Sequence, residues 1–135
     1  MKSIQPYLTF RGECQQALDF YKGIFNAEIK NVETYENKEI DIPGDYRKKY
    51  QHAELQGKGI NIMAYDASPD TPINEGNQVS LSIDLDSKEE TDEIFAKLSQ
   101  GGQVREKLQE TSWNAYYGSL RDKFGINWML NYQKN

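Results

Sequence analysis

A five-residue pattern occurs twice in this chain, as GINIM at residues 59–63 and as GINWM at residues 125–129. A half-chain module is too small to bury one face of a β-sheet by itself, so a repeat of this kind predicts two similar modules that pack as a pseudo-symmetric pair. The alternative is that GIN recurs by chance in two similar hairpins. The order of elements around each copy favours duplication.

Each copy of the pattern ends the same series of elements. The strand-like segments 4–10 and 77–83 share Gln and Leu at matching positions, and each precedes a stretch of helical periodicity. The apolar positions of the first helical stretch are Cys14, Ala17, Leu18, Tyr21, Ile24 and Phe25, and those of the second are Ile94, Phe95 and Leu98. The second helix is expected to start at Asp86 or Ser87, with Glu89 and Glu90 in its first turn.

Three further strand-like segments follow each helix, at 28–35, 50–55 and 59–66 and then at 103–110, 116–121 and 125–132. The order is therefore β-α-β-β-β, twice. We expect an α+β fold of two βαβββ modules in one domain, 1–135. Module 1 covers about 1–66, a linker about 67–76, and module 2 about 77–135.

Composition excludes several classes of function. The net charge is −5, which does not favour binding to a nucleic-acid backbone or an anionic membrane. No apolar run approaches the roughly 20 residues of a membrane span, and the N-terminus has no signal-peptide core. Cys14 is the sole cysteine, so no internal disulfide forms. These features predict a cytoplasmic protein with neither nucleic acid nor membrane as partner.

Strand alternation separates an apolar from a polar face on four strands. Ile60, Ile62 and Ala64 oppose Met63 and Tyr65, for example. The polar faces carry amides, hydroxyls, Tyr and Met without charge, which suits a cup that binds a small organic molecule. Its expected ligand-binding residues are Gln5, Tyr7, Met63, Tyr65, Gln78, Ser80, Trp113, Tyr116, Met129 and Asn131. The alternative is a polar layer between the sheets, filled by side chains and water.

His52 is the sole histidine, and its hairpin geometry places it on the polar face. A short turn pairs His52 with Met63 and Glu54 with Asn61, which makes His52 and Glu54 the candidate catalytic pair. The alternative is a structural histidine in a hydrogen-bonded layer. In the second hairpin, the same register puts Leu120 on the cup face, a conflict that a bulge or a frayed end would resolve.

Four stretches together resemble the vicinal oxygen chelate superfamily, which includes glyoxalase I, bleomycin-resistance proteins and extradiol dioxygenases. They are PYLTFRGECQQALDFYKGIFNAEI, HAEL, SLSIDLDSKEETDEIFAKLSQGGQV and QETSWNAYYGSLRDKFGINWMLN, and they cover most of the chain. More narrowly, the chain is similar to the PhnB-like branch, whose members often carry a demethylubiquinone methyltransferase-like label. The resemblance implies curved sheets around a cavity, commonly in a homodimer.

The resemblance also implies where a metal would bind. In metal-dependent relatives, four strand positions supply His, Gln or Glu ligands, and these fall at Gln5, Met63, Gln78 and Met129. Thioethers are poor ligands for the metals of this fold, so we expect no metal site. The alternative is a residual site that uses His52 and Glu54, although two adjacent ligands are few for a metal. No glycine-rich loop joins a leading strand to a helix, so we also expect no cofactor, S-adenosylmethionine included.

Two functions from different classes remain. The first is a metal-independent protein that binds a small-molecule ligand, as resistance members of the superfamily do, with Tyr7, Tyr65, Trp113 and Tyr116 stacking on it. The second is an enzyme that acts on an oxygen-rich substrate, with His52 as general acid or base and Glu54 as its orienting group or second carboxylate.

Overall fold

The computed structural model describes residues 1–37 and 42–134. It divides into two compact units, Met1–Asn74 and Glu75–Asn135. The elements follow in the order β1 (Tyr7–Phe10), α1 (Cys14–Phe25), β2 (Glu28–Thr34), the 3₁₀ turns η1 (Tyr35–Asn37) and η2 (Gly44–Tyr46), β3 (Tyr50–Gly57), β4 (Ile60–Asp66), β5 (Leu81–Asp84), α2 (Lys88–Leu98), β6 (Gln103–Glu110), β7 (Ala115–Arg121) and β8 (Asn127–Gln133).

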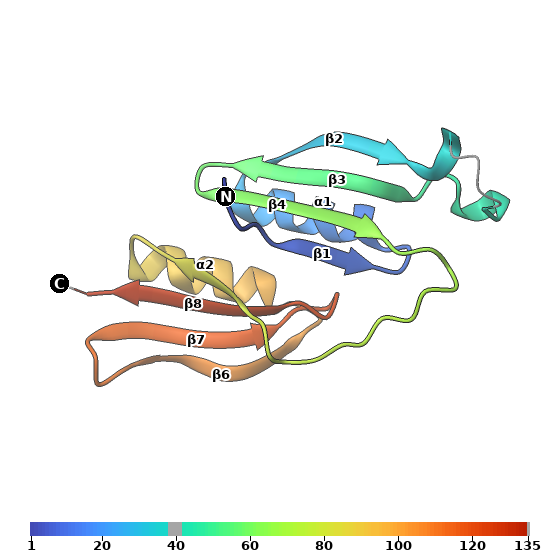
Figure 1. Cartoon of the computed structure of the whole chain (residues 1–135). Helices are drawn as coiled ribbons and strands as arrows, with labels where there is room; N and C mark the ends of the chain where they lie inside the picture. The colour runs from blue at the N-terminus through green and yellow to red at the C-terminus, as the bar shows by residue number, and fades with distance from the viewer. Residues whose placement is uncertain (38–41, 135) are drawn as a thin grey trace. The chain divides into compact units, whose positions relative to one another are not determined.

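The first unit contains one four-stranded sheet, here called sheet 1, in the order β1-β4-β3-β2. Strand β1 is parallel to β4, and the other neighbours are antiparallel. Helix α1 lies against one face (Figure 1). Its buried stripe is Cys14, Ala17, Leu18 and Tyr21, and the sheet contributes Phe10, Ala53, Leu55, Ile62 and Ala64 to the same core.

The second unit repeats this architecture in sheet 2, with the order β5-β8-β7-β6 and the same parallel and antiparallel pairs. Helix α2 lies against one of its faces (Figure 1) and buries Thr91, Phe95 and Leu98. The predicted fold class, two βαβββ modules, is confirmed. In each unit, the face of the sheet away from its helix is called the open face below.

The helices start by different means. At α2, the Ser87 side chain accepts a hydrogen bond from the Glu90 N–H at 3.0 Å, and the Glu90 carboxylate accepts one from the Asp86 N–H at 3.0 Å. This is local capping, as the sequence predicts. At α1, Glu13 makes no side-chain cap, and the first helical N–H, that of Cys14, donates to Asp66 of β4 at 2.9 Å.

The first hairpin corrects the predicted register. Glu54 pairs with Met63 and Leu55 with Ile62, so the strands are shifted by two residues from the expected pairing. Since Gly57 pairs with Ile60, the turn consists of two residues only, and its second residue, Gly59, has a φ of +77°. The shift is even, so every side chain keeps its predicted face.

The second hairpin shows that the predicted position of Leu120 is wrong. Arg121 pairs with Asn127 and Leu120 with Trp128, which leaves a five-residue loop in place of the expected four. The odd change reverses the faces, and Leu120 is fully buried on the helix side. Asp122 holds this loop, because its carboxylate accepts from the Phe124 and Ile126 N–H groups and from the Trp128 ring N–H at 2.8 Å.

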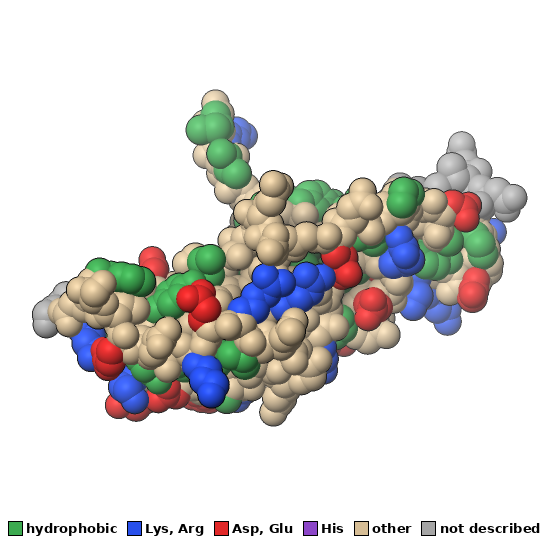
Figure 2. Space-filling view, turned by 90° about the horizontal axis from the view of Figure 1, so that it is seen from below, with side chains coloured by type: hydrophobic (Ala, Val, Ile, Leu, Met, Phe, Trp, Pro, Cys, Tyr) green, Lys and Arg blue, Asp and Glu red, His purple; other side chains and the backbone are tan. Residues whose placement is uncertain are grey.

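Two predicted strands are shorter than expected. Strand β1 starts at Tyr7 and β5 at Leu81, so the segments that carry Gln5, Gln78 and Ser80 precede the strands. No helix within residues 1–37 and 42–134 is long and apolar enough to cross a membrane. On the face shown in Figure 2, acidic and basic side chains are interspersed.

Candidate functional site

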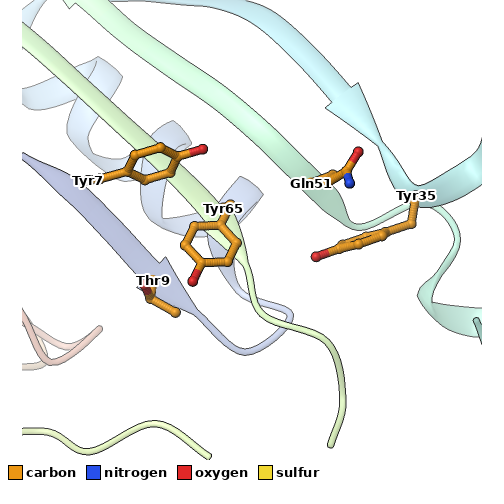
Figure 3. Close-up of a pocket in the computed structure, with 5 residues that line it drawn as sticks. All are labelled: Tyr7, Thr9, Tyr35, Gln51 and Tyr65. Carbon is orange, nitrogen blue, oxygen red and sulfur yellow. The ribbon is translucent and has the colours of Figure 1, made fainter. Parts of the chain in front are cut away.

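An open pocket of about 610 Å³ lies on the open face of sheet 1 (Figure 3). Tyr7 and Thr9 reach it from alternate positions of β1, because Leu8 and Phe10 point to the helix side. Tyr65 comes from β4, Gln51 from β3 and Tyr35 from the 3₁₀ turn after β2. The site is therefore built entirely within the first unit.

A β-bulge brings Gln51 to this pocket. Glu33 of β2 pairs with His52 and the next residue, Thr34, pairs with Tyr50, so Gln51 is an extra residue on β3. Its side-chain Oε1 is buried and has no hydrogen-bond partner among the described residues. A buried amide oxygen without a donor is unfavourable by about 1–3 kcal/mol, and a ligand that donates a hydrogen bond would satisfy it.

Two tyrosines of the pocket, Tyr7 and Tyr35, are held as neutral phenols. Burial raises the pKa of Tyr7 and of Tyr35 above the ordinary value. The Tyr35 hydroxyl donates to the Asp66 carbonyl at 2.5 Å, and the rings of Tyr7 and Tyr65 make an edge-to-face contact with centroids 5.3 Å apart. The five lining residues carry no charge, so the pocket favours a neutral ligand.

A chain of hydrogen bonds leads away from the pocket through Tyr7. The Tyr7 hydroxyl lies 2.7 Å from His52 Nδ1, and His52 Nε2 lies 3.0 Å from Glu54 Oε2. The Glu54 carboxylate also accepts from Asn31 at 3.2 Å and from Gln56 at 2.8 Å. The hydrogen bond from His52, followed by those from Asn31 and Gln56, lowers the pKa of Glu54 below its usual value.

These contacts fix how the candidate catalytic pair is arranged. The side chains of His52 and Glu54 are 25% and 21% exposed, and neither lines the pocket. Tyr7 is the member of the chain that lines it. The structure thus brings together the predicted residues Tyr7, Tyr65, His52 and Glu54, with Met63 beside Tyr7 and Glu54 in the sheet register.

The predicted residues of the second unit do not gather in the same way. Met129 and Asn131 lie on the open face of sheet 2. Trp113 lies in the turn between β6 and β7, is 58% exposed, and contacts the Tyr117 ring edge-to-face. Tyr116 is a correction, because it lies on the helix side, where its hydroxyl donates to Asp92 of α2 at 2.6 Å.

Sequence reasoning did not select three of the five lining residues, Thr9, Tyr35 and Gln51. Thr9 could have been found, since it shares a strand face with Tyr7. Tyr35 and Gln51 depend on a 3₁₀ turn and a bulge, and neither has a signal in the local sequence.

The residues at the four metal-ligand positions do not fit the metal of the wider superfamily. Met63 and Met129 offer thioethers, which are poor donors for a hard divalent ion, so only Gln5 and Gln78 offer oxygen donors. Within residues 1–37 and 42–134, no group of three or more His, Cys, Asp or Glu side chains is placed to hold a metal ion.

Comparisons with known proteins agree with this fold. Residues 2–131 match the family described as 3-demethylubiquinone-9 3-methyltransferase. The crystal structure of protein PA1353 from Pseudomonas aeruginosa is 32% identical, with a TM-score of 0.86 over 98% of this chain and 100% of the other. A putative 3-demethylubiquinone-9 3-methyltransferase, PhnB protein, from Bacillus cereus is 26% identical, with a TM-score of 0.83 over 97% and 99%.

A more distant structure places the fold in a wider group. The fosfomycin resistance protein FosX from Listeria monocytogenes is 15% identical, with a TM-score of 0.68 over 99% of this chain and 94% of the other. The likeness at this identity concerns the fold alone. The family match and the PhnB structure confirm the resemblance to the vicinal oxygen chelate superfamily and its PhnB-like branch, and FosX agrees with them in fold.

Proposed function

We propose that this chain, which belongs to the 3-demethylubiquinone-9 3-methyltransferase family, binds a small, neutral, hydroxyl-bearing ring compound in the pocket of sheet 1. Gln51 carries this proposal, because its side chain lines the pocket and its buried Oε1 has no donor among the described residues. A ligand hydroxyl would provide that donor. The three tyrosine rings supply apolar edges and faces for a ring.

The size and charge of the pocket support this ligand class. A volume of about 610 Å³ lies within the range of small-molecule sites, roughly 300–1,000 Å³. Thr9 and the tyrosines add hydroxyls that both donate and accept hydrogen bonds. The five described lining residues include no lysine or arginine, so a ligand that enters as an anion would lose its hydration without gaining a counter-charge from them.

The methyl transfer in the family's description is not part of this proposal. The connection between β1 and α1 is Arg11, Gly12 and Glu13, which has one glycine and cannot form a phosphate-cradling loop. An oxygenated ring compound, by contrast, is compatible with both the description and the pocket.

An NMR titration with catechol tests the proposal, with benzoate as an anionic counterpart. We expect catechol to shift the backbone amide signals of Thr9, Gln51 and Tyr65, and to bind more tightly than benzoate. Gln51→Met keeps the length of the side chain and removes the acceptor, so it should weaken catechol binding by about tenfold. Gln109→Met, the same change on the exposed strand β6, is the matched control and should leave binding unchanged. Catechol shifts confined to sheet 2, or equal affinities for the two probes, would contradict the proposal.

The second candidate function is an enzyme that uses His52 and Glu54 as its acid–base pair. The continuous hydrogen bonds from Tyr7 to His52 and from His52 to Glu54 favour it. A general acid or base must lie within hydrogen-bond reach of the proton it moves, and in this site Tyr7 stands between the pocket and the pair.

We also propose that the protein forms a homodimer. Strands β1 and β5, four residues each, are edge strands of their sheets, and such edges are commonly covered by a partner. Light scattering at micromolar concentration should give twice the mass of the chain. A mass of 15.6 kDa would mean a monomer and would contradict this expectation.

A further inference from the structure

We infer that Tyr7 is the catalytic group of this site, taking a proton from a hydroxyl of the bound ligand while it passes its own proton to His52. The inference rests on the proposed function, since the ligand must occupy the pocket that Tyr7 lines. His52 and Glu54 then act as positioning residues behind Tyr7. The substrate class is a phenol or another compound with a weakly acidic hydroxyl.

Hydrogen-bond directions follow from the carboxylate. Glu54 is ionised, because its pKa is lowered by the hydrogen bond from His52 first and by those from Asn31 and Gln56. A carboxylate only accepts, so His52 Nε2 must carry the proton that is shared at 3.0 Å. Nδ1 of the neutral ring is then an acceptor, and the Tyr7 hydroxyl donates to it at 2.7 Å. The free lone pair of the Tyr7 oxygen remains available to a hydroxyl in the pocket.

The transfer balances in atoms and charge. The ligand O–H bond breaks and a new O–H bond forms on Tyr7, while the original Tyr7 O–H bond breaks and an N–H bond forms at His52 Nδ1. The products are a ligand anion, a neutral Tyr7 and an imidazolium beside the Glu54 carboxylate. No oxidant, reductant or further reactant is needed.

Two protons must move together because Tyr7 alone is a poor acid. Burial, and then the neighbouring acidic groups Tyr65, Cys14, Glu33 and Glu54, raise its pKa. Lys30, which pairs with Glu54 across β2 and β3, is engaged by Glu28 at 3.6 Å. A Tyr7 phenolate is therefore disfavoured, and a relay that never forms one avoids that state.

A β-bulge in β2 positions Asn31 beside Glu54, the last residue of the relay. Lys30 pairs with Glu54 and Glu33 with His52, so β2 has an extra residue between these two pairs. Asn31 lies in this bulge with a φ of +55°, and its amide donates to the Glu54 carboxylate. A left-handed conformation is unfavourable for most side chains and tolerated by asparagine. The hydrogen bond from Asn31 keeps the Glu54 carboxylate in place as an acceptor for His52.

The first experiment needs no ligand. His52 is the sole histidine, so a nitrogen-15 spectrum of the imidazole contains one ring. We expect the neutral ring to carry its proton on Nε2 and to have a hydrogen-bonded, unprotonated Nδ1. Tyr7→Phe should move the Nδ1 signal toward that of a free acceptor, and Glu54→Gln should allow the other tautomer. Tyr117→Phe, which removes a tyrosine hydroxyl bonded to Glu106 on sheet 2, is the matched control and should change neither.

The second experiment uses 4-nitrophenol, whose anion absorbs visible light and whose neutral form does not. Binding to the wild-type protein should lower the pKa of the probe by about one unit, because the imidazolium that forms favours the anion. Tyr7→Phe, measured with the probe at a concentration that saturates the variant, should abolish the shift. Thermal unfolding of each variant verifies that it is folded.

The outcomes separate the relay from the binding site. A His52 ring protonated on Nδ1, or a probe shift that survives in Tyr7→Phe, overturns the relay. Binding of 4-nitrophenol to the wild type with no change in its pKa overturns the proton transfer and leaves the proposed function intact. Failure of both 4-nitrophenol and catechol to bind overturns the proposed function, and this inference with it.

Discussion

Sheet 1 and sheet 2 have the same strand order and the same pairing, but their open faces differ in chemistry. Aligning the sheets on Met63 and Met129 makes Tyr7 equivalent to Ser82, His52 to Tyr117 and Glu54 to Ser119. In sheet 2 the carboxylate belongs to Glu106 on the edge strand β6, and it accepts from Tyr117 at 3.1 Å and from Ser119 at 3.0 Å.

The comparison shows that each open face holds a carboxylate through neighbouring side chains, and that an imidazole is among the partners in sheet 1 while a phenol is among those in sheet 2. Burial and the bond to Glu106 raise the pKa of the Tyr117 phenol. The same strand order therefore carries two different sets of polar side chains, through substitutions at a few equivalent positions. Equivalent positions on the helix sides of the two sheets can be compared in the same way, through their effects on the free energy of unfolding.

The largest expected effect concerns Ile62 and Trp128, which are equivalent core positions. Trp128→Ala should lower the free energy of unfolding by about 3–5 kcal/mol, because it removes a ring that is 2% exposed and a bond to Asp122. Ile62→Val should lower it by only about 0.5–1.5 kcal/mol. Trp113→Ala, at a residue 58% exposed, is the control and should stay within about 0.5 kcal/mol. Urea denaturation measures all three. A Trp128→Ala variant with an unchanged free energy of unfolding would show that Trp128 is not part of the core.

The second effect compares the starts of the two helices. Asp66→Ala should lower the free energy of unfolding by about 3 kcal/mol, since the N–H groups of Cys14 and Tyr50 both lose their acceptor. Ser87→Ala should cost about 1 kcal/mol, the usual effect of losing a local cap. Chemical denaturation of the two variants gives the difference. Equal losses would mean that Asp66 acts only as a local cap does.

The third effect concerns Gly118, which occupies the position equivalent to Ala53. A Cβ at Gly118 would lie 2.9 Å from atoms of both Leu108 and Phe95. Gly118→Ala should therefore destabilise the protein by about 1–3 kcal/mol through overpacking. Adding Leu108→Ala should give a double variant more stable than the two single losses predict, because it removes one of the clashing groups. Strict additivity would show that the clash is relieved in another way.

The last effect is alkaline destabilisation, which appears only at high pH. Burial raises the pKa of Tyr46 to about 12, and the hydrogen bond to Asp92 raises that of Tyr116 to about 12. Both values exceed the ordinary 10.0, so the folded state holds these protons more tightly than the unfolded chain does. This contribution to stability is complete below pH 10 and is lost as the pH rises through about 12. Asp92→Asn should return Tyr116 toward its ordinary pKa and leave Tyr46 unchanged, as ultraviolet absorbance of tyrosinate will show.

Most of the fold could be predicted because its signals are local. Each of these signals lies within a short window of sequence: each copy of the repeat, the cap at Ser87, and the helical spacing of Cys14, Ala17, Leu18 and Tyr21. Strand alternation also placed Tyr7, Met63, Tyr65, His52 and Glu54 on one face, despite a register error of two residues. Face assignments survive an even error and fail with an odd one, which is why Leu120 was misplaced.

The rest of the site depends on irregular backbone and on distant partners. The bulge that presents Gln51 is defined by the pairing of β3 with β2, and the acceptor for the start of α1 comes from Asp66 at the end of β4. Tyr116 was misplaced because its strand is apolar or hydroxylated on both faces, so its pattern does not show which face α2 covers. Its hydroxyl could be assigned only once Asp92 was found beside it.

The glycine at position 118 also limits how the two halves can exchange sequence during evolution. Duplicated segments recombine with one another, and a short exchange that copied Ala53 onto position 118 would introduce a methyl group without the space for it. The exchange would succeed only if the segments carrying Leu108 and Phe95 were replaced as well. Selection against such intermediates helps the halves to diverge, so that the first can keep its hydrogen-bonded Tyr7, His52 and Glu54 while the second keeps the same strand order without them.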